Sequence, residues 1–357
     1  MAGDGELLIE RLLRVIDEGR RTATYKLALL LALVDTCAFH PGADELATHD
    51  LAVRVVELYY PQSRSYAAAD GVARELRQIS MKASSPLRHV LALRIAAEAA
   101  GCRSVAQAAR RLPDRYAATV DAVEDTFVRY PIPLLQAVGA TVVPFLYDLD
   151  WAEGTSARTL RRTGRDRVRL RPGVAERLVQ LGPLLRPLIE LHWTRDVARW
   201  SRVAVEDDHL RAHLFGATRA AFPAAVRDGL AALQDGRCFY CDAPLPRACD
   251  VDHFLPWSRW PNDAVENLVV ADRCNRDKSD HLVAPAHLER WVERFARSTE
   301  LLALAGHAGW ETDPARSAGL VRSTYGLLPA GTPLWRRRRE FERADDTIGA
   351  LVGRLTP

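Results

Sequence analysis

The sequence lacks most of the features that mark a specialised class of protein. Its formal net charge is only +3 over 357 residues, so a nucleic-acid surface must come from local basic clusters. Six cysteines, two of them within apolar helical patterns, do not favour a disulfide framework. There is no repeat or low-complexity tract, and no apolar run is long enough to span a bilayer. The first residues are acidic and polar, so we expect no secretory signal, a cytoplasmic location and no membrane partner.

One stretch, from Gly236 to Leu282, combines several side chains that can bind metal or move protons. In chain order these are Cys238, Cys241, Asp252, His253, Asn267, Cys274, Asn275 and Lys278. The apolar segments around them predict strand, loop, strand and helix. Folded back on each other, these elements would bring the Asp-His pair opposite Asn275.

These residue types suit the hydrolysis of a phosphodiester, which needs a deprotonated water and a cation near the phosphate. Asp252 and Asn275 offer a carboxylate and an amide oxygen, hard ligands that suit Mg²⁺ or Mn²⁺. His253 is then left as the general base, because imidazoles titrate near neutral pH. We expect Asn267 to orient His253. Lys278 lies one helical turn beyond Asn275 and is predicted to contact a phosphate.

The full pattern Cys-x-x-Cys, Asp-His-x-x-Pro-x-Ser, Asn-Leu, Cys-Asn-x-x-Lys resembles the HNH, or ββα-metal, endonuclease superfamily in a His-Asn-Asn variant. The resemblance covers only about an eighth of the chain. It implies that His253 is the general base and that Asp252 and Asn275 bind the divalent ion. It also implies that Asn267 steadies the catalytic loop.

The cysteines raise the separate question of a structural zinc ion. Many zinc-bearing members of this superfamily have a second Cys-x-x-Cys, but here Ala271 stands three residues before Cys274. Cys238, Cys241 and Cys274 supply three of the four ligands that a tetrahedral site needs. The candidates for the fourth are Cys249, His281 and Asp272. Without a fourth ligand the cysteines would be packed thiols.

Two basic runs are candidate phosphate contacts. The first alternates arginine with apolar residues and predicts a short β-hairpin turning at Thr163-Gly164. Its candidate nucleic-acid-binding residues are Arg158, Arg161, Arg162, Arg165, Arg167, Arg169 and Arg171. The second run, Arg336 to Arg339, is predicted to lie on a helix. For both runs the alternative is a solvated face without a ligand.

The remaining patterns predict a mainly α-helical protein with a small ββα-metal unit, a helical N-terminal region, the basic hairpin and a helical C-terminal extension. Helices are expected at 69–81, at 175–202 with a break at Gly182-Pro183, and at 334–355. The expected domains are 1–150, a helical domain for recognition, regulation or assembly; 151–220, a connecting region; 221–305, the nuclease; and 306–357, the C-terminal extension.

Together these patterns predict a metal-dependent endonuclease that cleaves DNA, with a role in restriction or phage defence favoured. The alternatives are a zinc-knuckle protein that binds nucleic acid without cutting it and a nuclease that acts on RNA. The N-terminal region is expected to mediate a homodimer or to contact a regulatory partner.

Overall fold

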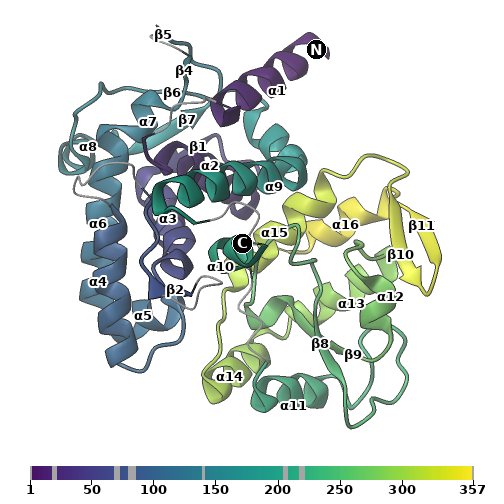
Figure 1. Ribbon diagram of the computed structural model, residues 1–357. Helices are drawn as coiled ribbons and strands as arrows, with labels where there is room; N and C mark the ends of the chain where they lie inside the picture. The colour runs from purple at the N-terminus through teal and green to yellow at the C-terminus, as the bar shows by residue number, and fades with distance from the viewer. Residues whose placement is uncertain are drawn as a thin grey trace. The chain divides into compact units, whose positions relative to one another are not determined.

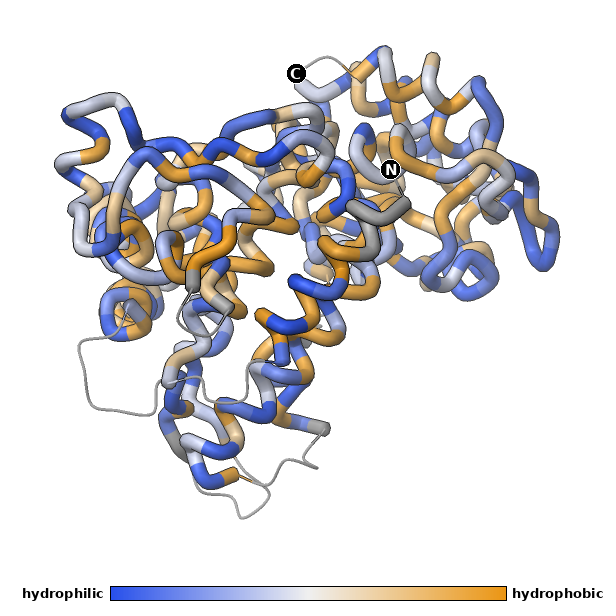
Figure 2. The backbone as a smooth tube through the Cα atoms, turned by 90° about the horizontal axis from the view of Figure 1, so that it is seen from above, coloured by the Kyte–Doolittle hydropathy of each residue, from blue (hydrophilic) through white to orange (hydrophobic). Residues whose placement is uncertain are grey.

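The protein folds into two compact units, each of which is described here by itself. The computed structural model describes residues 2–17, 22–67, 73–78, 86–138, 141–203, 208–216 and 222–355. Unit 1 comprises Met1–Cys37 and Gly42–Thr218, and unit 2 comprises Ala38–Pro41 and Arg219–Pro357. Both are rich in helix (Figure 1). Along most of the chain polar and apolar residues alternate, as expected of elements that bury one face (Figure 2).

Unit 1 is built around a buried helix, α2. Its helices are α1 (Ala2–Asp17), α2 (Tyr25–Phe39), α3 (Thr48–Gln62), α4 (Pro86–Ala99), α5 (Val105–Arg111), α6 (Pro113–Arg129), α7 (Pro131–Leu134), α8 (Ala157–Thr163), α9 (Val174–Ser201) and α10 (Asp208–Phe215). All residues of α2 from Leu27 to Val34 are fully buried, because this segment is apolar on every side. Asp35, also in α2, forms ion pairs with Arg54 of α3 and Arg186 of α9.

Short antiparallel strands complete unit 1. They are β1 (Glu45–Ala47), β2 (Tyr66–Ala67), β3 (Ala73–Arg74), β4 (Ala137–Val138), β5 (Thr141–Val142), β6 (Tyr147–Asp148) and β7 (Arg167–Leu170). The only sheet of three strands among the described residues has the order β1-β7-β6. The helix expected at 69–81 is wrong where it can be compared, because β3 pairs with β2. Residues 69–72 and 79–81 lie outside the described part.

Two further expectations in unit 1 are corrected. The first arm of the basic hairpin is helix α8, because the Ser156 side chain caps its first turn and Gly164, with a φ of 65°, ends it. The second arm is indeed a strand, β7, but it pairs with β1 and β6. Helix α9 continues through Gly182-Pro183 without a break. Its buried residues, among them Leu178 and Trp193, supply packing that outweighs the cost of an internal proline.

Unit 2 places helices around a two-stranded sheet. Its elements are α11 (Ala224–Leu233), β8 (Asp250–His253), a 3₁₀ turn η1 (Val265–Asn267), β9 (Leu268–Ala271), α12 (Cys274–Lys278), α13 (Pro285–Phe295), α14 (Ser298–Ala308), α15 (Pro314–Gly326), β10 (Pro333–Arg337), β11 (Glu340–Arg343) and α16 (Thr347–Gly353). Strands β8 and β9 are antiparallel, with Asp252 opposite Val269 and His253 opposite Leu268. Helices α11 and α14 bury Val226, Leu230 and Leu301 against β9.

Side chains also cover the edge of β9 that faces away from β8. Gln234 donates to the Val270 carbonyl and accepts from the Val270 amide, both at 2.8 Å. Arg294 of α13 donates to the carbonyls of Leu268 and Glu266. Because these groups complete the backbone hydrogen bonding of a short edge strand, they hold α11 and α13 in place.

The C-terminal part differs from the expected helix at 334–355. Strands β10 and β11 form a hairpin, so the run Arg336 to Arg339 lies on the hairpin, and only Thr347–Gly353 is helical. Trp335 explains the difference, because its backbone pairs with Leu282 and Ala284 and its side chain is fully buried. Among the described residues of the whole chain, no helix combines the length and apolar character needed to cross a bilayer.

A short peptide from the first part of the chain belongs to unit 2. Residues 38–41 pack against α15, where Ser323 donates to the Ala38 carbonyl at 2.7 Å. The Arg316 guanidinium lies over the Phe39 ring at 4.2 Å. Gly319 faces the Phe39 carbonyl so closely that a β-carbon there would overlap it. Glycine is therefore required at position 319 by this contact.

Candidate active site

Asp252 is a buried carboxylate at the end of β8. Its side chain is 9% exposed, and Tyr240 donates its hydroxyl hydrogen to Oδ2 at 2.5 Å. The Lys278 ammonium lies 3.1 Å from the same oxygen and 3.4 Å from Oδ1. Burial raises the pKa of Asp252, and the positive charge of Lys278 opposes that rise.

The position of Lys278 differs from the one expected. Its side chain is 1% exposed, and besides Asp252 it donates to the His253 carbonyl at 2.8 Å. An ammonium that is buried and bonded in this way is not open to a phosphate. Lys278 instead supplies the charge that compensates Asp252 inside the protein.

His253, the next residue, is held by an acid that the motif does not contain. Its Nε2 lies 2.8 Å from Oδ1 of Asp263, and the two side chains are 18% and 32% exposed. The rings of Phe222 and Trp257 flank the imidazole, with centroids 5.7 and 5.3 Å away. An Nε2–H bonded to Asp263 leaves Nδ1 as the acceptor nitrogen of a neutral imidazole.

Asn267 closes the loop between β8 and β9. It is buried, and its Oδ1 accepts from the Leu255 amide at 2.9 Å. Its Nδ2 donates to the carbonyls of Leu255 and Asn262, at 3.2 and 3.0 Å. Because these bonds tie together both ends of the loop that carries Asp263, Asn267 fixes the distance between Asp263 and His253.

Asn275 lies on α12, three residues before Lys278 and half-buried. Residues three apart share a helix face, so Asn275 lies on the side of α12 that faces β8, where Lys278 reaches Asp252. The donor set of one carboxylate and one amide oxygen has the hardness that Mg²⁺ or Mn²⁺ prefers. Oδ1 of Asp252 makes only a long contact with Lys278, at 3.4 Å, among the described residues, and is the oxygen best placed to bind a cation.

Three cysteines form a second candidate metal site. The sulfurs of Cys238, Cys241 and Cys274 all lie within 4.8 Å of one another. Zn–S bonds of about 2.3 Å place tetrahedral sulfurs roughly 3.8 Å apart, so the cluster has a suitable size for zinc. Hydrogen bonding to Cys274 lowers the pKa of Cys238, which favours the thiolate form that binds metal.

The structure does not bring the expected fourth ligand to this cluster. Among the described residues, neither Cys249 nor His281 nor Asp272 joins the three sulfurs within that distance. Cys249 packs instead against the apolar cluster of α11 and α14, and the His281 ring contacts Phe341 at 4.9 Å. Within the described part of the chain, the cluster therefore offers three sulfur ligands.

Three of the seven basic residues of the first run pair with acids of unit 1. Arg161 bonds Asp121 and Glu124, Arg169 bonds Glu45, and Arg171 bonds Asp148. Arg165 donates to the Asp150 carbonyl. Such contacts are typical of a structural, solvated surface, and phosphate binding by this run stays a prediction. In the described part of the chain, Arg158, Arg162 and Arg167 form no ion pair.

Two site residues, Asp263 and Tyr240, were missed from the sequence. Asp263 stands in a polar loop ten residues after His253, where spacing alone does not indicate contact. Tyr240 lies between Cys238 and Cys241, and in the sequence it looks like a packing residue. In the second case a signal existed, because a buried tyrosine hydroxyl requires a polar partner.

Two protein families match the chain. A family described as "Domain of unknown function (DUF8808)" matches residues 5–214, which is more than half of the chain. A family described as "HNH endonuclease" matches residues 238–284, the segment that carries the cysteines, Asp252, His253, Asn267 and Asn275. Neither a curated protein nor a solved structure matches the chain. The chain thus carries an HNH domain over a short segment.

Proposed function

We propose a nuclease function for this chain, which belongs to the family described as a domain of unknown function (DUF8808) and carries an HNH domain at residues 238–284. The function is the metal-dependent hydrolysis of phosphodiester bonds in DNA. We interpret β8, β9 and α12 as the ββα unit of such an enzyme. The observation that carries the proposal is the pairing of His253 with Asp263 directly beside the buried carboxylate of Asp252.

The mechanism follows from the position of His253. With Nε2–H bonded to Asp263, Nδ1 accepts a proton from water, and the hydroxide attacks phosphorus. The bond between phosphorus and the oxygen opposite the attacking one breaks, and this oxygen leaves with the electron pair. As positive charge develops on the ring, the Asp263 carboxylate stabilises it. Asp263 is thus a positioning residue, and Asn267 holds the loop that carries it.

The divalent ion would be held by Asp252 and Asn275, and when bound it supplies positive charge to the phosphate oxygens. Lys278 and Tyr240 hold the Asp252 carboxylate in a fixed orientation. Cys238, Cys241 and Cys274 would hold a separate structural zinc.

The test is cleavage of supercoiled plasmid by the full chain with Mg²⁺, Mn²⁺ or EDTA, comparing wild type with His253→Ala and Asp252→Ala. We expect metal-dependent cleavage that falls at least ~100-fold in His253→Ala, with unchanged binding of a DNA duplex. His307→Ala, a substitution at a histidine outside the HNH segment, serves as the control and should cleave like wild type. Unaltered cleavage by His253→Ala would refute the mechanism.

Two alternatives give different results in the same assay. A zinc-knuckle binding protein would bind the duplex but cleave it with none of the metals. A nuclease specific for RNA would spare plasmid and cut an RNA strand of the same sequence. The role in restriction or phage defence and the oligomeric state stay predictions from the sequence.

A further inference from the structure

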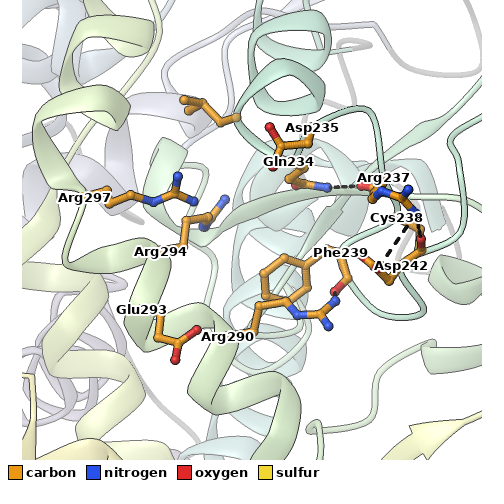
Figure 3. Close-up of a pocket in the computed structure, with 11 residues that line it drawn as sticks. Gln234, Asp235, Arg237, Cys238, Phe239, Asp242, Arg290, Glu293, Arg294 and Arg297 are labelled. Carbon is orange, nitrogen blue, oxygen red and sulfur yellow. Dashed lines mark hydrogen bonds and ion pairs between the residues drawn. The ribbon is translucent and has the colours of Figure 1, made fainter.

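A pocket of unit 2 carries positive charge for which the proposed mechanism has no use. Its volume is about 480 Å³, and it lies between the end of α11, the segment around Cys238 and Phe239, and α13. Figure 3 shows Arg290, Arg294 and Arg297 on one side of it and Gln234, Asp235 and Arg237 on the other. None of the residues proposed for proton transfer or for the divalent ion lines this pocket.

The charge balance of the lining favours an anion. Four guanidinium groups line the pocket against three carboxylates, those of Asp235, Asp242 and Glu293. Asp242 lies 3.8 Å from Arg237 and so offsets that cation. Arg297 lies 3.8 Å from Glu300, but both side chains are about half exposed, which weakens this pair.

Arg294 is the group that most needs an anion. It is 5% exposed, and both of its terminal nitrogens donate to neutral carbonyl oxygens. Its Nε is buried without a hydrogen-bond partner in the described structure. Burial lowers the pKa of Arg294 to about 10, so the side chain still carries its charge at neutral pH. A buried cation that has only neutral hydrogen-bond partners is costly, and a nearby anion in the pocket would offset its charge.

Neighbouring arginines add donors at the same place. Arg290 also bonds a carbonyl, that of Phe239, and Arg297 stands just beyond the end of α13. In the view of Figure 3 the side chains of Arg294 and Arg297 extend toward each other. Several guanidinium groups directed to one cavity suit a phosphate, because its oxygens accept more hydrogen bonds than a single carboxylate does.

We infer that this pocket binds a phosphate group through Arg294, Arg297 and Arg290. The phosphate belongs either to the nucleic-acid backbone or to a free phosphate compound, and only the first source rests on the proposed function. Arg294 also covers the edge of β9, so its substitution would damage the fold. Arg297 is therefore the residue to change.

The experiment compares Arg297→Glu with Arg354→Glu in the full chain. Arg354 is a matched control, because it lies 3.7 Å from Glu289 with side-chain exposures of 48% and 53%, against 54% and 46% for Arg297 and Glu300. Two probes are used in EDTA: inorganic pyrophosphate, titrated by calorimetry, and a DNA duplex, followed by anisotropy over a range of salt concentrations. Pyrophosphate affinity should fall about 10-fold or more in Arg297→Glu alone.

The duplex measurement distinguishes the two possible sources of the phosphate. If the pocket holds a backbone phosphate, Arg297→Glu lowers the slope of log affinity against log salt by about one unit, and pyrophosphate competes with the duplex. If it holds a free phosphate compound, pyrophosphate binding is lost and duplex binding stays unchanged. Equal binding of both probes by Arg297→Glu and Arg354→Glu would overturn the inference. Because no cleavage is measured, failure of the nuclease mechanism would not produce that result.

Discussion

Replacing Lys278 by methionine tests whether the buried pair with Asp252 holds the site together. Methionine keeps most of the side-chain volume and removes only the charge and its hydrogen bonds. At the observed 3.1 Å, two unit charges attract by about 5 kcal/mol for an effective dielectric constant of about 20. Removing one partner of a buried pair typically costs about 3–5 kcal/mol. We therefore expect Lys278→Met to lose at least ~3 kcal/mol of unfolding free energy.

The assay is urea unfolding in EDTA, followed by tryptophan fluorescence and circular dichroism. Arg336→Met is the control, because Arg336 forms an exposed pair with Glu342 at 3.0 Å and should cost less than about 1 kcal/mol. The double variant Asp252→Asn/Lys278→Met should regain much of the loss, since it leaves no uncompensated charge. Without Lys278, the buried Asp252 carboxylate becomes neutral only by taking up a proton. The loss of unfolding free energy should therefore be larger at about pH 8 than at about pH 5.

Two outcomes would refute this reasoning. A loss below ~1 kcal/mol in Lys278→Met would mean that water reaches the pair and screens it. A double variant no more stable than Lys278→Met would mean that the lost stability comes from packing around position 278 and not from the charge of Asp252.

Three other predictions concern separate parts of the protein. Asp263→Asn should lower kcat about 10- to 100-fold with little change in KM, and Asp263→Glu should recover part of the lost kcat. A loss of substrate binding as large as the loss of kcat would contradict a positioning role. Cys241→Ser should reduce bound zinc from near one ion per chain to near zero and lower Tm; zinc absent from the wild type would return the cysteines to a packing role. The Glu124 carboxylate, whose Oε2 lies 3.9 Å from Nδ1 of His49, raises the pKa of His49, so this pair should stabilise the protein fully below about pH 6.5 and lose its effect as the pH rises through the folded-state pKa. His49→Gln should therefore lower the urea midpoint at about pH 5 but not at about pH 9, and a deficit that does not change with pH would argue against the pair.

The sequence allowed the candidate site to be located, but it did not predict which side chains contact each other there. The pattern around Asp252 and His253 predicted two strands and a helix in the order that the structure shows, because the polar turn and the apolar run after Asn267 are local signals. The contact between Asp263 and His253 depends on how a ten-residue loop closes. That closure is set by Asn267 and Asn262 and has no periodic signature.

The errors in the fold have the same physical origin. At Ala157–Thr163 the alternation of arginine with apolar residues was extended into a hairpin, although Ser156 and Gly164 carry the signals of a helix start and end. At Pro333–Arg337 the strand is stabilised by distant backbone partners, Leu282 and Ala284, which local propensity does not contain. A buried Lys278 was likewise unexpected, because lysine is rarely buried without a specific partner.

The peptide formed by residues 38–41 makes unit 2 discontinuous along the chain. A fragment that starts at Arg219 would contain the whole HNH segment but would lack the carbonyls of Ala38 and Phe39 that lie against α15. Ser323 would lose its hydrogen-bond acceptor, and the surface of α15 at Gly319, which the Phe39 carbonyl contacts, would be exposed to water. Unit 2 therefore cannot be isolated intact as one continuous fragment, and a protease that cleaves between Cys37 and Gly42 would loosen α15 while sparing every residue of the candidate active site.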